Sequence, residues 1–113
     1  MPYIKSGNGR REALQQGEPA LTAGELNYQI FYYIKHHNNA DIQLIKSYID
    51  NFLGEKPNYQ RYNDMTGALI RCKKEIERRL NLNASLLRVL MEYYDDEIAK
   101  YEDQKINENG DVE

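Results

Sequence analysis

Apolar residues recur at three- and four-residue steps along most of the chain, which is the spacing of one face of a helix. The first such stripe consists of Leu26, Ile30, Tyr33 and Ile34. Thr22 and Glu25 precede it with the spacing of a capping box, in which each side chain satisfies the other residue's backbone N–H. The pattern therefore predicts a helix from Ala23 to about His37.

A polar break at residues 36–39 separates this stripe from a second one, which consists of Ile42, Ile45, Ile49, Phe52 and Leu53. We expect the second helix to end at Gly54, because glycine suits a left-handed C-terminal cap and Pro57 prevents simple continuation. His36 and His37 are expected to cap the end of the first helix rather than to bind metal.

A third stripe predicts a helix that runs from about Tyr59 to Leu80, through Tyr62, Thr66, Leu69, Ile70, Lys73 and Ile76. Gly67 interrupts it. An interior glycine costs about 1 kcal/mol relative to alanine. Gly67 therefore marks either a close approach of two helices or a tolerated defect.

The fourth stripe has near-heptad intervals and consists of Leu86, Leu87, Leu90, Met91, Tyr94, Ile98 and Tyr101. Such a stripe packs either within one subunit or against another chain. Asn81, Asn83 and Ser85 favour a break before it, and the alternative is a single helix over residues 58–104.

Glycine and proline punctuate residues 1–21 and leave room for only a short helix around residues 10–16. The polar tail 107–113 cannot bury enough surface to fold alone. We therefore predict an irregular N-terminal segment (1–21), a helical domain (22–106) and a polar C-terminal tail (107–113). The predicted fold class is all-α, with about four helices in a small bundle or hairpin.

The composition is that of a folded protein, with 41% hydrophobic and 29% charged residues. The sequence shows no membrane span and no signal peptide, which predicts a cytoplasmic protein. A single cysteine and two histidines do not supply a structural zinc site. We expect Cys72 to be a small core residue and expect no cofactor.

Ten tyrosines, against two phenylalanines and no tryptophan, dominate the aromatic content. Each buried tyrosine needs a partner or water for its hydroxyl. Helices with short loops carry more apolar and tyrosine surface here than a small monomer covers. We therefore expect a homo-oligomer.

Several short motifs resemble a known family. They are residues 1–5 (Met-Pro-Tyr-Ile-Lys), residues 22–28 (Thr-Ala-Gly-Glu-Leu-Asn-Tyr), Gly67 and Leu69 with Lys73, Glu75 with Arg78 and Arg79, and the ending 101–112. On these residues the chain resembles a family of short phage and prophage proteins, which implies an all-α fold and a phage origin. The family's biochemical role is unassigned, so the resemblance implies no mechanism.

Two features depart from that family. Glu77 stands where its members usually have an aromatic residue before the paired arginines. A long helical stretch, about residues 80–100, also separates Arg79 from Tyr101, where relatives have a short connection.

Charge is distributed unevenly although the net charge is only −3. Residues 71–88 contain six basic and two acidic residues, whereas residues 92–113 contain nine acidic residues and two lysines. The first interpretation is two solvated faces, and the alternative is attraction in a hairpin or between subunits.

The basic segment also predicts a ligand site, because arginine pairs bidentately with phosphate and tyrosine stacks on bases. The candidate residues are Tyr59, Tyr62, Arg71, Lys74, Arg78 and Arg79. A small nucleotide, cyclic or linear, suits this acidic protein better than long nucleic acid does, because long nucleic acid needs many phosphate contacts. In the alternative, Arg78 and Arg79 pair with Glu75 or with the acidic tail.

An acidic set on the last helix gives a metal alternative. Glu92, Asp96 and Asp103 lie near one helical face, as in Mg²⁺-dependent all-α nucleotide pyrophosphohydrolases, but a second acidic motif is missing. The leading hypothesis is a non-enzymatic phage accessory protein that binds a host protein or a small ligand as a homo-oligomer. Nucleotide sequestration and Mg²⁺-dependent hydrolysis are the alternatives.

Overall fold

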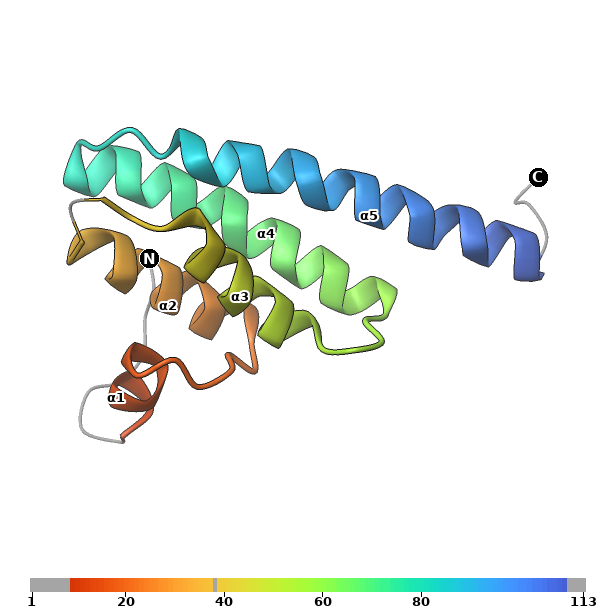
Figure 1. The fold of residues 1–113 in the computed structure, drawn as a ribbon, viewed down its shortest axis with the longest axis horizontal. Coiled ribbons are helices and arrows are strands. Elements are labelled where there is room, and N and C mark those ends of the chain that lie inside the picture. Colours follow the sequence, from red (N-terminus) through yellow and green to blue (C-terminus); the bar gives the residue numbers. More distant parts are fainter. Residues whose placement is uncertain (1–8, 38, 110–113) are drawn as a thin grey trace.

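All regular structure in the part of the chain that the structure describes is helical, which confirms the predicted class (Figure 1). The computed structural model describes residues 9–37 and 39–109, so the predictions for the opening motif 1–5 and for residues 110–113 lie outside it. The elements in chain order are α1 (Arg10–Gln15), α2 (Ala23–Lys35), α3 (Ile42–Leu53), α4 (Tyr59–Glu75), the π-helical η1 (Ile76–Leu80) and α5 (Ser85–Asn109).

The four longer helices form a bundle in which α5 runs antiparallel to α4 (Figure 1). α2 and α4 share the most extensive interface, and α3 packs against both. α1 contacts α2 at one side of the bundle. The C-terminal half of α5 extends past the ends of the other helices, so its last turns stand away from the core (Figure 1).

The predicted stripes supply the core. Its fully buried side chains are Leu14, Leu26, Ile30, Ile45, Ile49, Phe52, Met65, Leu69, Cys72, Ile76 and Leu87. Cys72 is thus a small core residue, as expected, and its Sγ lies 3.7 Å from the backbone oxygen of Asn27. Burial of the thiol raises its pKa, so the thiolate needed for reactivity is disfavoured.

The break between the last two helices is confirmed. Asn81 adopts a left-handed conformation with φ 53° and ψ 37°, which asparagine tolerates better than most residues. Asn83 Oδ1 then accepts a hydrogen bond of 2.9 Å from the backbone N–H of Ser85, the first residue of α5. Residues 81–84 are therefore not helical, and the alternative of one continuous helix over residues 58–104 is wrong.

The capping box is only half correct. Thr22 Oγ1 accepts a 3.1 Å hydrogen bond from the backbone N–H of Glu25, as predicted. The Glu25 carboxylate, however, accepts from the N–H of Leu21 at 2.9 Å and from Arg10. A long-range arginine therefore decides where this carboxylate points.

Gly67 is a tolerated defect rather than a point of close helix approach. It is exposed, and a Cβ added to it meets no atom within 4 Å. Gly54 ends α3 with a positive φ of 78°, as predicted, but its ψ of −174° lies outside the left-handed helical region, so the expected left-handed cap is not formed.

The ends of two helices differ from the prediction. α2 ends at Lys35 with His36 as its C-cap, slightly before the expected end. α5 continues to Asn109 and so enters the predicted polar tail. Gln104 and Lys105 both contact the Glu108 carboxylate, and such pairs one turn apart support a final helical turn.

Candidate functional site

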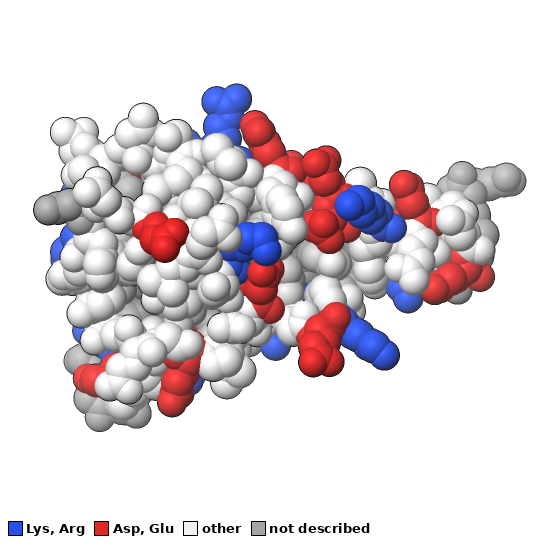
Figure 2. Space-filling model, in the orientation of Figure 1, with Lys and Arg blue, Asp and Glu red and all other residues white. Residues whose placement is uncertain are grey.

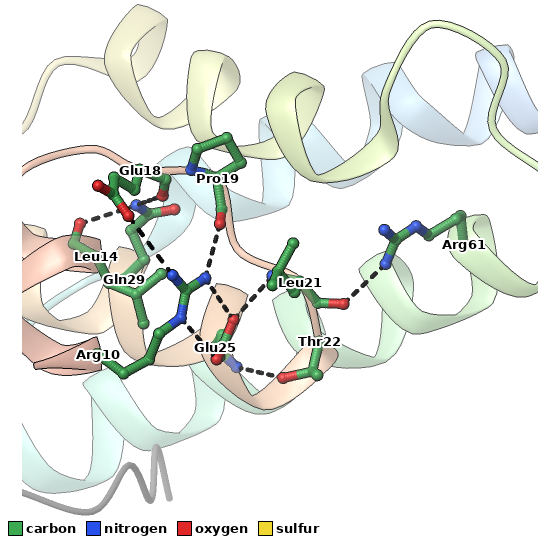
Figure 3. Close-up of polar contacts among 9 residues, drawn as sticks. All are labelled: Arg10, Leu14, Glu18, Pro19, Leu21, Thr22, Glu25, Gln29 and Arg61. Carbon is green, nitrogen blue, oxygen red and sulfur yellow. Dashed lines mark hydrogen bonds and ion pairs between the residues drawn. The ribbon is translucent and has the colours of Figure 1, made fainter. Parts of the chain in front are cut away.

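Arg10 on α1 and Glu25 on α2 form an ion pair, which we call the clasp, that fixes α1 against α2 (Figure 3). Arg10 donates to both carboxylate oxygens of Glu25, through Nε at 2.8 Å and Nη2 at 2.7 Å, and Nη2 also reaches the backbone oxygen of Pro19 at 2.8 Å. The hydrogen bond from Arg10 lowers the pKa of the Glu25 carboxyl, although partial burial acts in the opposite direction. The bidentate pair therefore holds the start of α1 in one orientation.

The end of α1 is held by a buried amide. Gln29 on α2 is 2% exposed, and its Nε2 donates to the backbone oxygens of Leu14 and Glu18, both at 2.8 Å. Arg61 on α4 donates at 2.9 Å to the backbone oxygen of Leu21 in the following loop (Figure 3). The Gln29 contacts hold the carbonyls at and just after the end of α1, and the Arg61 contact holds the loop that leads into α2.

A cleft of about 430 Å³ opens between α1, α2 and η1. Its size lies in the range of small-molecule sites. We define it as the basic cleft, and its lining residues are Arg11, Glu12, Gln15, Tyr28, Phe31, Tyr32, Lys35, His36 and Arg79.

One wall of the basic cleft is a row of rings along α2. The Tyr28 and Tyr32 rings stack with centroids 6.1 Å apart, and the His36 ring lies 4.3 Å from that of Tyr32. Gln15 Nε2 on α1 donates at 2.8 Å to the Tyr28 hydroxyl. Tyr28 is buried whereas Tyr32 is half-buried, so Tyr32 presents ring surface to the cleft.

Cations surround these rings. The Arg11 guanidinium carbon lies 5.8 Å from the centroid of the Tyr28 ring, and that of Arg79 lies 5.3 Å from the Phe31 ring. Lys35 adds a third positive charge, and among the cleft's described lining residues Glu12 alone is acidic. This combination suits a small anion that carries a flat ring, because the cations attract the anion and the ring stacks.

The π-helical turn positions Arg79. α4 passes directly into η1, and the wider turn sets residues 76–80 in a different register from the preceding helix. π-helical turns are rare and occur frequently at functional sites. In this register Arg79, which lies in η1, packs over the ring of Phe31 on α2.

The structure separates the six residues predicted from sequence. Arg79 lines the basic cleft, whereas Tyr62 is buried on the side of α4 that faces α5. Arg78 donates at 2.8 Å to the buried carboxylate of Glu75, as one alternative predicted. Burial acts to raise the pKa of Glu75, the hydrogen bond and charge of Arg78 act to lower it, and the net pKa is lowered.

The other three candidates, Tyr59, Arg71 and Lys74, are exposed on α4. The sequence prediction missed Arg11, Tyr28, Tyr32 and Lys35. Tyr28, Tyr32 and His36 follow one another at four-residue steps, which is a signal of a second stripe beside the apolar stripe of α2.

Among the described residues 9–37 and 39–109, no group of three or more His, Cys, Asp or Glu side chains is placed to hold a metal ion. Glu92, Asp96 and Asp103 are all exposed along α5. His37 Nδ1 lies 2.8 Å from the backbone oxygen of Tyr33, which agrees with the predicted capping role. Within the same ranges, no helix combines the length and hydrophobicity of a membrane span.

Residues 1–85 match the model of a family described as a domain of unknown function, DUF6899. The chain belongs to the DUF6899 family. No curated protein and no solved structure matches it. The DUF6899 match contains every residue of the basic cleft and ends at the first residue of α5. Membership in an uncharacterised family is thus confirmed, whereas a phage origin stays a prediction.

Proposed function

We propose that this DUF6899 member is a non-enzymatic binding protein that holds a small nucleotide in the basic cleft. The observation that carries the proposal is the meeting of Arg11, Lys35 and Arg79 with the ring row of α2 in one cleft of about 430 Å³. In this arrangement the cations hold phosphate oxygens and Tyr32 stacks on the base. A phage accessory role, in which the protein sequesters a nucleotide signal, is the biological setting that we propose.

A nucleotide panel tests the proposal. Adenosine and guanosine mono-, di- and triphosphates, together with their 3′,5′-cyclic monophosphates, are added to the protein while its melting temperature is measured. A ligand that binds the folded state raises the melting temperature. If no member of the panel raises it, the proposal is wrong.

A matched pair of variants then locates the site. Arg79→Gln removes a cation from the basic cleft, and Arg71→Gln removes one from the exposed face of α4. A hydrogen bond to a charged group contributes roughly 1.5–3 kcal/mol, so Arg79→Gln should weaken binding by about tenfold or more in isothermal titration. Arg71→Gln should leave it within about twofold. Equal losses in both variants would favour the sequence-predicted cluster instead.

The expected homo-oligomer is part of this proposal. Large apolar side chains that remain exposed include Leu21, Leu44, Ile70, Leu82 and Val89. Such residues lie on several elements, and self-association would remove them from water. Light scattering at micromolar concentration checks the prediction, and a monomeric mass would contradict it.

A further inference from the structure

A second cleft, lined by acidic rather than basic residues, lies between α3, the turn that follows it, and α5. Its volume is about 230 Å³. We define it as the acidic cleft, and the side chains used below are Asp50, Glu55, Glu97, Tyr62, Tyr93 and Tyr94. In Figure 2 red carboxylates, with blue basic side chains among them, lie over this part of α3, its following turn and α5.

The acidic cleft combines carboxylates with tyrosine rings. Asp50, Glu55 and Glu97 come from three different segments, and none of the cleft's described lining residues is a lysine or an arginine. Just outside the lining, Lys100 Nζ lies 3.8 Å from Glu97 Oε1, so a ligand cation competes with Lys100 for this carboxylate. Tyr94 Oη donates at 2.5 Å to Asp50 Oδ1. Burial, together with this hydrogen bond and the charge of Asp50, raises the pKa of Tyr94, so its hydroxyl stays protonated and holds the wall in place.

The ammonium of Lys46 already contacts a carboxylate and a ring of this cleft. Lys46 on α3 places Nζ 2.8 Å from Asp50 Oδ2 and 5.1 Å from the centroid of the Tyr93 ring. The hydrogen bond to Asp50 raises the pKa of Lys46, which favours its charged form. A carboxylate and a ring face therefore hold a primary ammonium at the edge of the cleft.

We propose that the acidic cleft is a binding site for an organic cation, a primary ammonium or a guanidinium group, that is held by Glu97 and Glu55 and covered by tyrosine rings. Aromatic faces and carboxylates together recognise such cations. A neighbouring cleft of about 560 Å³ shares Glu55, Tyr62 and Glu97 and continues along α5, where Lys56, Lys100 and Lys105 also line it, so this part suits a neutral or anionic group. It gives room for the rest of a ligand whose cationic end occupies the acidic cleft.

Two sources supply this chemistry, and separate titrations distinguish them. Spermidine represents a free polyamine, and a blocked tripeptide with a central arginine represents the side chain of a protein partner. Each is titrated into the full chain and followed through the tyrosine NMR signals. Saturable shifts at Tyr93 and Tyr94 with either probe support the site, and the tighter probe identifies the source. No saturable shift with either probe overturns the proposal.

A pair of variants separates the site from general attraction to an acidic protein. Glu97→Gln removes a cleft carboxylate, and Glu102→Gln removes an exposed one from the same helix. Glu97→Gln should weaken cation binding by about fivefold or more, with Glu102→Gln close to wild type. Equal weakening in both variants would show nonspecific attraction and overturn the proposal.

A third variant predicts a gain. Lys46→Met keeps most of the side-chain stem but removes the ammonium that occupies Asp50 and Tyr93. An external cation then meets an additional carboxylate and ring, so its affinity should rise by about threefold or more. A purely structural role for Lys46 predicts no gain, and unchanged or weaker binding would contradict the assignment.

Discussion

The basic and acidic clefts both use tyrosine rings, but they differ in their charged residues and in how their walls are held. The basic cleft depends on a short N-terminal helix fixed by arginine and glutamine contacts across many residues. The acidic cleft lies beside a long helix that is packed through an apolar seam and joined to α3 by Tyr94 and Asp50. In both proposed sites the tyrosines provide ring surface, and the charged residues beside them set the charge of the ligand that we propose.

The largest effect should come from breaking the clasp. Arg10→Met leaves the half-buried Glu25 carboxylate without its bidentate partner, and we expect a loss of roughly 2–3 kcal/mol in the free energy of unfolding. Because α1 forms a wall of the basic cleft, nucleotide binding should be lost as well, whereas cation binding at the acidic cleft persists. Urea unfolding and titration measure the two effects.

The exposed Arg71 gives the control, since Arg71→Met should change stability by less than about 0.5 kcal/mol. A clasp variant as stable as this control would mean that α1 is held by other contacts, and the contrast between the two clefts would fail.

A smaller loss is expected on the other side of the molecule. Tyr94→Phe keeps the buried ring and removes the hydroxyl that donates to Asp50, so the unfolding free energy should fall by about 1 kcal/mol. Tyr59→Phe, at a ring that is 54% exposed, should have no measurable effect. Equal stability of both variants in urea would show that apolar packing alone, without the Tyr94 hydroxyl, holds α5 in place.

The pH dependence of the unfolding free energy tests the contribution of the Arg10–Glu25 ion pair. The pKa of Glu25 is lowered in the folded protein by Arg10, whereas an unfolded glutamate has a pKa of about 4.3. The stability from this pair is therefore complete above that pH and is lost as the pH falls through the folded pKa. The fall in unfolding free energy between neutral pH and about pH 3 should be larger in the wild type than in Glu25→Gln. An identical fall would contradict the assigned ion pair.

The smallest effect is a gain. Gly67 lies in the exposed part of α4 with open space around its Cβ position, so Gly67→Ala should stabilise the protein by about 0.5–1 kcal/mol without altering either cleft. Gly54→Ala is the opposite case, because φ is 78° there and alanine is strained. Thermal unfolding compares the two, and a destabilised Gly67→Ala would revive the close-approach interpretation.

The four longer helices were predictable because each has an apolar stripe that follows a local capping or turn residue. Thr22, Gly54 and Asn83 act within a few residues of their positions, so the sequence pattern contains their effect. The clasp was not predictable in this way, because Arg10 meets Glu25 only after α1 has folded back on α2. The half-formed capping box is the direct result of that long-range contact.

The candidate site was predicted only in part for a related reason. Arg79 was identified from the basic segment, but its side of the helix depends on the π-helical turn, whose residues look like an ordinary helix in sequence. Arg11 and Tyr28 lie far apart in sequence and meet through the docking of α1. Arg71 and Lys74 are exposed on α4, which agrees with the first interpretation of the charged segments as solvated faces.

The most direct test of the nucleotide proposal is a map of where the ligand binds. Two-dimensional NMR spectra of the full chain are recorded while the tightest-binding nucleotide of the panel is added. The proposal predicts the largest shifts at Arg11, Tyr28, Tyr32 and Arg79, with Tyr93 on α5 unchanged. Shifts concentrated at Tyr59, Arg71 and Lys74, or at the acidic cleft, would contradict it.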